Sequence, residues 1–397
     1  MQARTESPSL PSAAISIVQI NSRLSGGGTD DQAVKLTVGL KKLGHQVSVL
    51  GPASTGFAEI IQRSGVPLQN SPTNKISFIL RAAKFLRSNA ARIIHAHHGR
   101  DYWPAIIAAR LSGRRPAIVL TRHLAKSPSS WASRHFLLSQ CAALVAVSEF
   151  TARVLRDGAY EPHSPEAERR VRPPLKGDHS KIRVIYGGID CDLFQPCEAE
   201  KQRVAWGLQP QEFAFAVVGG FDFPRGKGQR EFLKAAAKIH EQIPRARFLV
   251  IGRGNMEQLL REDIQQLGLV NKARLTGQCY NMSSGMNAID CLVHPQIGTE
   301  ALGLVVCEAH ACGKPVIASD LDGIPEAFAA GNYGRLVPPE SVEALAEAML
   351  YQAGQPPRSR DEKLRIHDRV RKQFSIETSS KRVSELYAEL MGTYSHG

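Results

Sequence analysis

The sequence is poor in several features by which classes of protein are recognised. Aromatic residues account for 6% of its 397 residues and do not alternate with the basic ones, which disfavours a surface for stacking nucleic-acid bases. Its apolar runs are short, and none approaches the roughly 20 residues of a membrane-spanning helix. Residues 1–14 lack a charged stretch followed by an apolar core, so we expect a flexible N-terminal tail and no secretory signal.

Cysteine is also scarce, with seven residues and no Cys-x-x-Cys pair. An odd number without paired spacing disfavours both a disulfide framework and a zinc site. Most of the cysteines lie in apolar segments, where a thiol behaves as a small hydrophobic group. We therefore expect a reducing compartment, the cytoplasm.

The composition is otherwise that of a soluble globular protein, with 43% hydrophobic and 22% charged residues. A chain of this length predicts two domains, with three possible. The net charge of +13 is unevenly spread, because residues 1–195 hold 26 basic and 13 acidic side chains whereas residues 196–397 hold 24 of each. A first half with this excess favours an anionic partner, such as lipid head groups, a phosphorylated glycan or nucleic acid.

Short β-rich segments alternate with helical ones along the chain, which predicts parallel sheets covered by helices on both faces. Strands are expected at 14–20, 46–50, 92–96, 117–121, 143–147 and 182–185 in the first half, and at 213–218, 247–251, 273–275, 291–293, 315–318 and 334–337 in the second. The clearest helices are expected at 31–43, 74–87, 229–242, 302–311 and 375–392.

This order predicts an α/β fold of two Rossmann-like, doubly wound domains that face a cleft. Turn-forming and polar residues near 190–210 place the limits of the domains at 15–195 and 196–374, and the helix at 375–392 is free to pack back on the first domain. Residues 161–179 carry four prolines and clustered arginines, which predicts an inserted surface loop. Ligands of such sheets bind beyond the carboxyl ends of the strands.

The strongest local signal is the segment GTEALGLVVCEAHACGKPVIASDLDGIPE at residues 298–326. A glycine-containing loop precedes the helix expected at 302–311, and the free N–H groups and partial positive charge of a helix N-terminus suit a phosphate. Glu300 lies just ahead of that end, and Glu308 lies two turns in, where a carboxylate can accept hydrogen bonds from a ribose. Taken alone, two glutamates on a helix are most often ordinary surface charges.

The residues around the two glutamates resemble the retaining GT-B glycosyltransferases of family 4, also called group 1. The matching positions include Pro295, Glu300, Gly303, Leu304, Glu308, Gly313, Pro315, Gly323 and Glu326. Weaker resemblances follow in the family's order at 21–28, 40–49, 93–98, 146–149 and 185–194. The resemblance implies that Glu300 holds sugar hydroxyls near the anomeric carbon, that Glu308 binds the ribose, and that the amides of Gly303 and Leu304 bind the phosphates.

The loop VGGFDFPRGKG at 218–228 is similar to a second part of the family's donor site. Family members bind the donor diphosphate with an arginine after the first glycines and a lysine before the last one. Lys227 matches the lysine, whereas Gly220 and Phe221 stand where the arginine is expected, and Arg225 is a candidate to replace it. Gly220 is also counted among the donor-binding residues, as is Arg253, which is expected near the base and the sugar.

The loop SGGGTD after the first strand offers Gly27 and Gly28 for close approach to the donor diphosphate. It is not a G-x-G-x-x-G fingerprint and no P-loop lysine follows, which disfavours a dinucleotide cofactor. By resemblance, His123 lies close to the reacting sugar and is a catalytic candidate, while His98 and Arg122 are candidates to bind the acceptor. The run H-A-H-H has no carboxylate or cysteine at ligand spacing, so no metal is expected.

The resemblance implies a hexosyltransferase of the EC 2.4 class that moves a hexose from a nucleotide-diphosphate sugar to a glycan or lipid-linked acceptor. It implies retention of the anomeric configuration, by attack on the same face as the diphosphate leaves. No cofactor or metal is expected, because lysine and a helix N-terminus supply positive charge. The expected setting is lipopolysaccharide or cell-surface polysaccharide synthesis.

A basic first domain is expected to draw the protein to the anionic inner face of a membrane, where each basic residue contributes about 1 kcal/mol. The candidate residues are Arg81, Lys84, Arg87, Arg114 and Arg115. A solvated basic surface is the plain alternative.

Three other functions stay open at this level. One is a sugar-nucleotide 2-epimerase of the same fold, and another is a protein that binds a nucleotide sugar without turnover, which the missing arginine motivates. The third is a basic nucleic-acid-binding protein, which the few aromatic residues disfavour. The sequence does not choose the sugar or the base, nor the acceptor among lipopolysaccharide core, undecaprenyl-linked glycan, phosphatidylinositol and a small metabolite.

Overall fold

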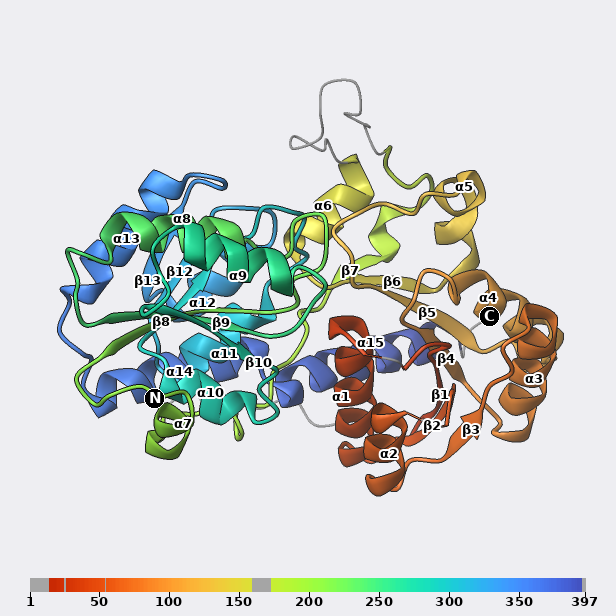
Figure 1. The fold of residues 1–397 in the computed structure, drawn as a ribbon. Coiled ribbons are helices and arrows are strands. Elements are labelled where there is room, and N and C mark those ends of the chain that lie inside the picture. The colour runs from red at the N-terminus through yellow and green to blue at the C-terminus, as the bar shows by residue number, and fades with distance from the viewer. Residues whose placement is uncertain (1–13, 25, 54, 159–172, 395–397) are drawn as a thin grey trace, which may run out of the picture. The chain divides into compact units, whose positions relative to one another are not determined.

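Strands and helices alternate to build two α/β units in the computed structural model, which describes residues 14–24, 26–53, 55–158 and 173–394 (Figure 1). Unit 1 comprises residues 1–147, 151–188 and 376–397, and unit 2 comprises residues 148–150 and 189–375. Most of the predicted N-terminal tail, and residues 161–172 of the predicted insertion, lie outside the described residues.

The chain passes from unit 1 to unit 2 between Gly188 and Ile189, earlier than the predicted limit at 195/196. The polar segment that suggested the later limit belongs to unit 2, where it includes α7 (Glu200–Ala205). Ile189 is fully buried, and its N–H donates to the carbonyl of Phe374 at 2.7 Å. The domain limit therefore falls at a buried backbone contact and not in the polar stretch.

Unit 1 is built on a seven-stranded parallel sheet of order β3-β2-β1-β4-β5-β6-β7. Its strands are β1 (Ser16–Ile20), β2 (Gln46–Gly51), β3 (Leu68–Asn70), β4 (Ile93–Ala96), β5 (Ala117–Arg122), β6 (Ala143–Ala146) and β7 (Ile182–Val184). Its helical segments are α1 (Gly28–Lys42), α2 (Gly56–Arg63), α3 (Lys75–Ser88), α4 (Tyr102–Leu111), α5 (Trp131–Gln140), α6 (Glu149–Asp157), which begins at the residues assigned to unit 2, a short 3₁₀ turn (His179–Lys181) and α15 (Ile376–Tyr394).

Unit 2 repeats the pattern with a six-stranded parallel sheet of order β10-β9-β8-β11-β12-β13. Its strands are β8 (Phe213–Val218), β9 (Ala246–Ile251), β10 (Ala273–Gly277), β11 (Cys291–His294), β12 (Val316–Ser319) and β13 (Gly334–Val337). Its helices, besides α7, are α8 (Gln229–Ile239), α9 (Glu257–Gln266), α10 (Met282–Ala288), α11 (Leu304–Ala311), α12 (Ile324–Gly331), α13 (Val342–Ala353) and α14 (Arg360–Phe374). Both orders are those of doubly wound sheets, which confirms the predicted fold class.

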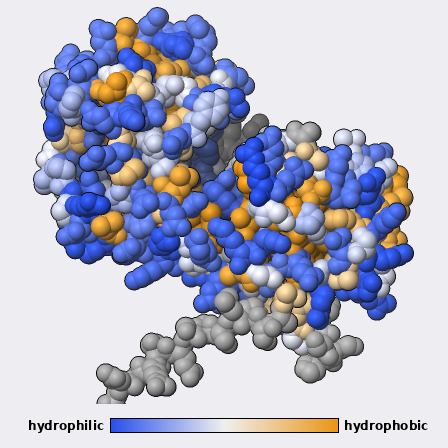
Figure 2. Space-filling model, turned by 90° about the horizontal axis from the view of Figure 1, so that it is seen from below, coloured by the Kyte–Doolittle hydropathy of each residue, from blue (hydrophilic) through white to orange (hydrophobic). Residues whose placement is uncertain are grey.

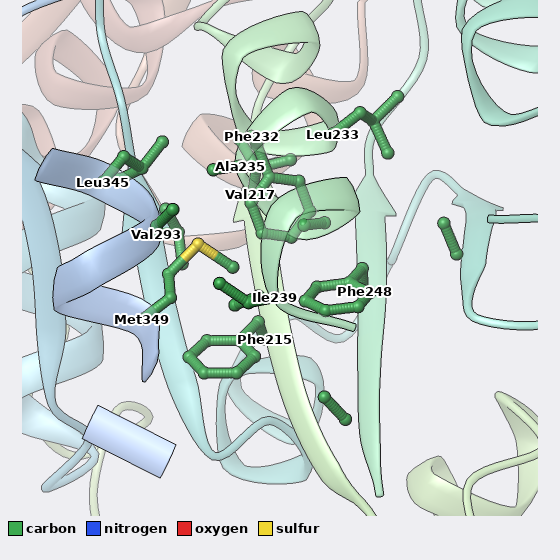
Figure 3. Packing of buried hydrophobic residues seen from close by; sticks show 14 of the residues in the cluster. Phe215, Val217, Phe232, Leu233, Ala235, Ile239, Phe248, Val293, Leu345 and Met349 are labelled. Carbon is green, nitrogen blue, oxygen red and sulfur yellow. The ribbon is translucent and has the colours of Figure 1, made fainter. Parts of the chain in front are cut away.

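Phenylalanine and β-branched residues fill the unit 2 core between the sheet and the helices α8 and α13. Figure 3 shows Phe215 and Val217 facing Phe232 of α8, with Met349 reaching in from α13. Full burial of one such side chain stabilises the fold by about 1.5–3 kcal/mol. This packing makes a firm support for the loops that leave the strands.

The last helix, α15, belongs to unit 1 although 187 residues of unit 2 separate it from the preceding unit 1 segment. It lies beside α1 (Figure 1), and the approach at Gly39 is so close that an added Cβ atom would fall 2.0 Å from Ser380 Oγ. Tyr387 is fully buried, and its hydroxyl lies 2.6 Å from His95 Nδ1 in β4. The C-terminal helix is thus part of the unit 1 core.

In each sheet the strand order reverses beside the first strand, between β1 and β4 in unit 1 and between β8 and β11 in unit 2. The loops that leave these strands diverge to opposite faces and create the crevice in which doubly wound sheets bind ligands. In unit 1 they are the glycine loop before α1 and the histidines after β4. In unit 2 they are the glycine loop before α8 and the segment between β11 and α11.

Hydrophilic residues predominate on the face shown in Figure 2, with hydrophobic ones in small groups between them. Within the part of the chain that the structure describes, no helix is both long enough and apolar enough to cross a membrane.

Candidate functional site

Lys227 and Glu300 meet at the carboxyl edge of the unit 2 sheet. Lys227 lies in the loop between β8 and α8, and Glu300 lies between β11 and α11. Lys227 Nζ donates to Glu300 Oε2 at 2.7 Å, and the side chains are 36% and 19% exposed. The structure therefore joins two predicted catalytic residues that are 73 positions apart in the sequence.

The surroundings keep Glu300 ionised and the neighbouring His294 neutral. Burial by itself would raise the pKa of Glu300, but the charge of Lys227 and its hydrogen bond bring that pKa below its usual value. Burial lowers the pKa of His294 to about 4, with Lys227 adding to the effect and Glu300 opposing it. Neither ring nitrogen of His294, which is 2% exposed, has a hydrogen-bond partner among the described residues.

Close backbone contacts hold the loop of Lys227 in place. Gly228 precedes α8 with φ 82°, and a Cβ atom there would fall 1.9 Å from the carbonyl oxygen of Pro295. The buried Gln229 accepts the N–H of Lys227 at 2.7 Å through its Oε1 atom. Only glycine fits position 228, so the match to the family motif has a steric cause.

The N-terminus of α11 lies directly after Glu300. Gly303 occupies the position before the helix in the left-handed conformation, at φ 82°. Asp322 accepts the N–H of Glu300 at 3.0 Å and so fixes the backbone that carries the carboxylate. Glu308 is the fifth residue of α11, about one turn from its start and not two, because the helix begins at Leu304 and not at 302.

In unit 1, Asp30 organises the glycine loop. It is 1% exposed, and its carboxylate accepts from the N–H of Gly26 at 3.0 Å and from Asn21 Nδ2 at 3.0 Å, while His98 Nε2 lies 2.7 Å away. Burial would raise its pKa, but these hydrogen bonds lower it to about 2. Gly27, which precedes α1 at φ 97°, and Gly28 have open space where a Cβ atom would stand, so backbone conformation and not crowding requires glycine at 27.

The histidines after β4 and β5 form a chain of contacts. His97 Nδ1 lies 3.4 Å from His123 Nε2, and His97 Nε2 lies 2.7 Å from Gln19 Oε1. The rings of His95 and His97 stack at 4.3 Å. Burial, followed by the nearby His98 and Arg122, lowers the pKa of His123 below its usual value, so this ring is neutral at pH 7.

Arg122 is less available to bind the acceptor than the sequence indicates. Its side chain is buried, and Nε donates to the carbonyl of Lys126 at 2.7 Å. Its Nη1 atom lies close to Gly99, where a Cβ atom would approach to 3.2 Å. Part of this guanidinium therefore stabilises the turn that follows β5.

Two glycosyltransferase family models match this chain, one in each half. Residues 198–363 match the family model of glycosyl transferases group 1, and residues 26–163 match that of glycosyltransferase family 4. A phosphatidyl-myo-inositol mannosyltransferase of Mycolicibacterium smegmatis is 26% identical over 82% of this chain and 80% of its own length. A lipopolysaccharide core biosynthesis mannosyltransferase of Rhizobium meliloti is 25% identical over 95% of this chain and 98% of its own.

A structure of Anabaena HepE in complex with UDP has the same fold, with a TM-score of 0.77 at 18% identity over 94% of this chain and all of the other. The chain belongs to the GT-B glycosyltransferases of group 1, family 4. It is thus an enzyme of the glycosyltransferase class, as predicted.

The glycosyltransferase departs from its family at the expected arginine. Phe221 stands near that position and is 1% exposed, packed in the unit 2 core. Arg225 lies exposed in the same loop, with Nη1 3.5 Å from the carbonyl of Ile297. Gly220 adjoins this loop, and the exposed Arg253 follows β9, where its carbonyl accepts the N–H of Phe221 at 3.3 Å.

Four residues of the glycosyltransferase site were not predicted: Asp30, Gln229, His294 and Asp322. Asp30, Gln229 and Asp322 hold backbone N–H groups of the loops. The spacing Gly-Gly-Gly-x-Asp before a helix was the one available signal, for Asp30. Among the described residues, no group of three or more His, Cys, Asp or Glu is arranged to hold a metal ion.

Proposed function

We propose that this glycosyltransferase moves a hexose from a nucleoside-diphosphate sugar to a glycan or lipid-linked acceptor, with retention of the anomeric configuration. The observation that carries the proposal is the Lys227–Glu300 pair beside the start of α11. It brings a cation, an ionised carboxylate and free helix N–H groups to the ligand-binding edge of one sheet.

Unit 2 would hold the donor. The ammonium of Lys227 and the N–H groups of Gly303 and Leu304 would bind the diphosphate, with Arg225 as the additional cation. Removal of one such charge-stabilising group typically costs about 2.7–4 kcal/mol in the transition state. Glu300 would accept hydrogen bonds from sugar hydroxyls, and Glu308 would bind the ribose.

Unit 1 would hold the acceptor near the reacting sugar. A neutral His123 can donate or accept a hydrogen bond at neutral pH, and its Nε2 atom lies 3.4 Å from His97 Nδ1. His98, held by Asp30, would line the acceptor side, and the glycine loop with Gly27 and Gly28 would approach the donor diphosphate.

The transfer step would proceed on one face of the sugar. The acceptor oxygen forms a bond to the anomeric carbon while the bond from that carbon to the diphosphate oxygen breaks. The acceptor's proton passes to a departing phosphate oxygen, so no carboxylate nucleophile is needed. Lys227 compensates the negative charge that develops on the leaving diphosphate.

The acceptor would belong to lipopolysaccharide or cell-surface polysaccharide synthesis at the inner face of the membrane. The relatives named above act in lipopolysaccharide core synthesis and on phosphatidyl-myo-inositol. On α3, Arg81, Lys84 and Arg87 are exposed together with Ile76 and Leu80, which are 70% and 59% exposed. Basic side chains beside exposed apolar ones suit an anionic lipid surface.

Two experiments test the proposal. Thermal stabilisation by UDP-, GDP- and ADP-sugars identifies the donor, and radiolabelled transfer to a membrane extract then measures turnover. Lys227→Ala and Glu308→Ala should abolish or strongly reduce transfer while the circular dichroism spectrum is retained. Unchanged transfer in both variants would refute the site, and binding without turnover in the unaltered chain would favour a non-catalytic nucleotide-sugar-binding protein.

A further inference from the structure

Unit 2 has a second concave site at the edge of the sheet opposite Lys227 and Glu300. It is a hollow of about 280 Å³, which we call the amino-edge hollow. Its lining includes Phe213, Arg245, Asp290, Lys314, Tyr333 and Lys363. Phe213 opens β8, and Asp290, Lys314 and Tyr333 stand within two residues of the starts of β11, β12 and β13. The hollow therefore lies at the amino ends of the strands.

The acidic side chains of this hollow already have cationic partners outside its lining. Asp290 Oδ2 pairs with Arg203 Nη1 at 3.1 Å and accepts the N–H of Ala214 at 2.8 Å. The buried Glu212 pairs with Arg247. Both carboxylates are thus shared with arginines outside the lining, although Asp290 also acts on Lys314.

Of the cations that line the hollow, Arg358 pairs with Glu362 at 2.6 Å, whereas Arg245, Lys314 and Lys363 form no ion pair with any described residue. Lys314 Nζ donates to the carbonyl of Asn287 at 2.8 Å, and Arg245 Nη2 donates to the carbonyl of Ala353 at 2.8 Å, so both meet neutral oxygens. Lys363 lies near enough to Lys314 for the two positive charges to repel. Burial and this repulsion lower the pKa of Lys314 to about 8, although Asp290 opposes the effect. An anion between these groups would relieve the repulsion.

We propose that the amino-edge hollow binds a small phosphate-bearing anion, at a site separate from the Lys227–Glu300 pair. Its volume lies just below the range of about 300–1,000 Å³ for sites that bury drug-sized ligands, which suits a compact ligand. A second hollow of about 490 Å³ shares Tyr333, Gln355 and Arg358 with it. Arg358 lies over the ring of Tyr333 at 5.2 Å, so the shared wall offers a flat surface for a sugar or base attached to the phosphate.

The site is tested by calorimetric titration of inorganic pyrophosphate into the full-length chain carrying Lys227→Met, which weakens anion binding at the carboxyl edge. We expect one pyrophosphate per chain, with a dissociation constant in the micromolar range at low ionic strength. Adding Lys314→Met and Lys363→Gln should weaken this binding at least tenfold. The matched control is Lys234→Gln, because Lys234 is an exposed lysine of α8 outside the lining. This substitution should change the affinity for pyrophosphate less than twofold.

No binding in the Lys227→Met chain, or equal affinity in the Lys314/Lys363 variant and the Lys234 control, would overturn the proposal. If circular dichroism shows that Lys314→Met does not fold, Lys363→Gln is tested alone. A loss of pyrophosphate affinity of at least threefold then supports the proposal, and a smaller loss overturns it. Glucose 1-phosphate and UMP are titrated in the same way. Tighter binding of either than of pyrophosphate assigns the site to an organic phosphate, and weaker binding of both assigns it to the inorganic ion. Because Lys227 is absent throughout, failure of the sugar-transfer proposal does not affect the result.

Discussion

Replacing Lys227 with methionine leaves Glu300 as a carboxylate without its cation. Breaking a fully buried ion pair costs about 3–5 kcal/mol, whereas exposed pairs contribute about 0–1 kcal/mol. Glu300 is 19% exposed and Lys227 is 36% exposed, so the pair lies between these limits. We expect Lys227→Met to lower the free energy of unfolding by about 2 kcal/mol at pH 7. Lys227→Met with Glu300→Gln should recover at least half of this loss, because the carboxylate charge is then gone.

The pH dependence of this loss follows from the pKa of Glu300. In the natural chain that pKa lies below its usual value of 4.5, so the pair contributes stability above about pH 4.5 and loses it as the pH falls. Without Lys227, burial raises the pKa of Glu300, and protonation becomes favourable at higher pH. The difference in stability between the two proteins should therefore be largest near pH 7 and should shrink towards pH 4.

Urea unfolding followed by circular dichroism between pH 4 and pH 7.5 measures this difference, and transfer of radiolabelled sugar measures turnover. We expect kcat to fall about 10²–10³-fold in Lys227→Met, the usual cost of one charge-stabilising donor. Lys234→Met serves as the control for charge alone. A stability loss that does not change with pH, or that Glu300→Gln does not relieve, would refute the coupling between the two side chains.

Further predictions concern single elements of the two units. Asp30→Asn should lower the free energy of unfolding by about 2 kcal/mol at pH 7, because the hydrogen bonds that lower the pKa of Asp30 to about 2 are weakened. This loss should disappear as the pH falls from about 4 towards 2. A loss that stays constant with pH would contradict the role of the Asp30 carboxylate. His294→Leu should leave stability unchanged or raise it by about 1 kcal/mol, because its buried ring nitrogens have no partner among the described residues, and thermal unfolding checks this. Glu308→Ala should raise the KM for the donor at least tenfold with a smaller change in kcat, as loss of ribose binding predicts; an unchanged KM would exclude that role. Deleting residues 376–397 should leave an insoluble chain, whereas deleting 395–397 alone should not, as expression and gel filtration would show.

Much of the fold could be predicted because buried parallel strands carry continuous runs of apolar residues. Every predicted strand is present within one or two residues of its expected limits. β3 (Leu68–Asn70) was missed because its sequence, LQN, has no β-branched or aromatic residue. α14 (Arg360–Phe374) was missed because charged residues dominate it and its few apolar positions, such as Ile366 and Val370, form a thin stripe.

The site was predictable where a family motif carries its residues and not where single polar side chains act at a distance. Lys227 and Glu300 stand in motifs, and the structure joins them. Asp322 and Gln229 act by accepting backbone N–H groups, which leaves no pattern in the sequence. The hydrogen bond from Arg122 to the carbonyl of Lys126 could not be predicted either, because it depends on the shape of the turn after β5.

The position of α15 has a consequence for how the protein is made. Val383, Leu386 and Tyr387 complete an apolar layer over strands that the ribosome finishes more than 200 residues earlier. Until the final turns of the chain emerge, α1 and α2 cover this side of the N-terminal sheet only in part. A premature stop codon before residue 383 would leave this apolar layer permanently incomplete, even though every strand of the sheet had been made.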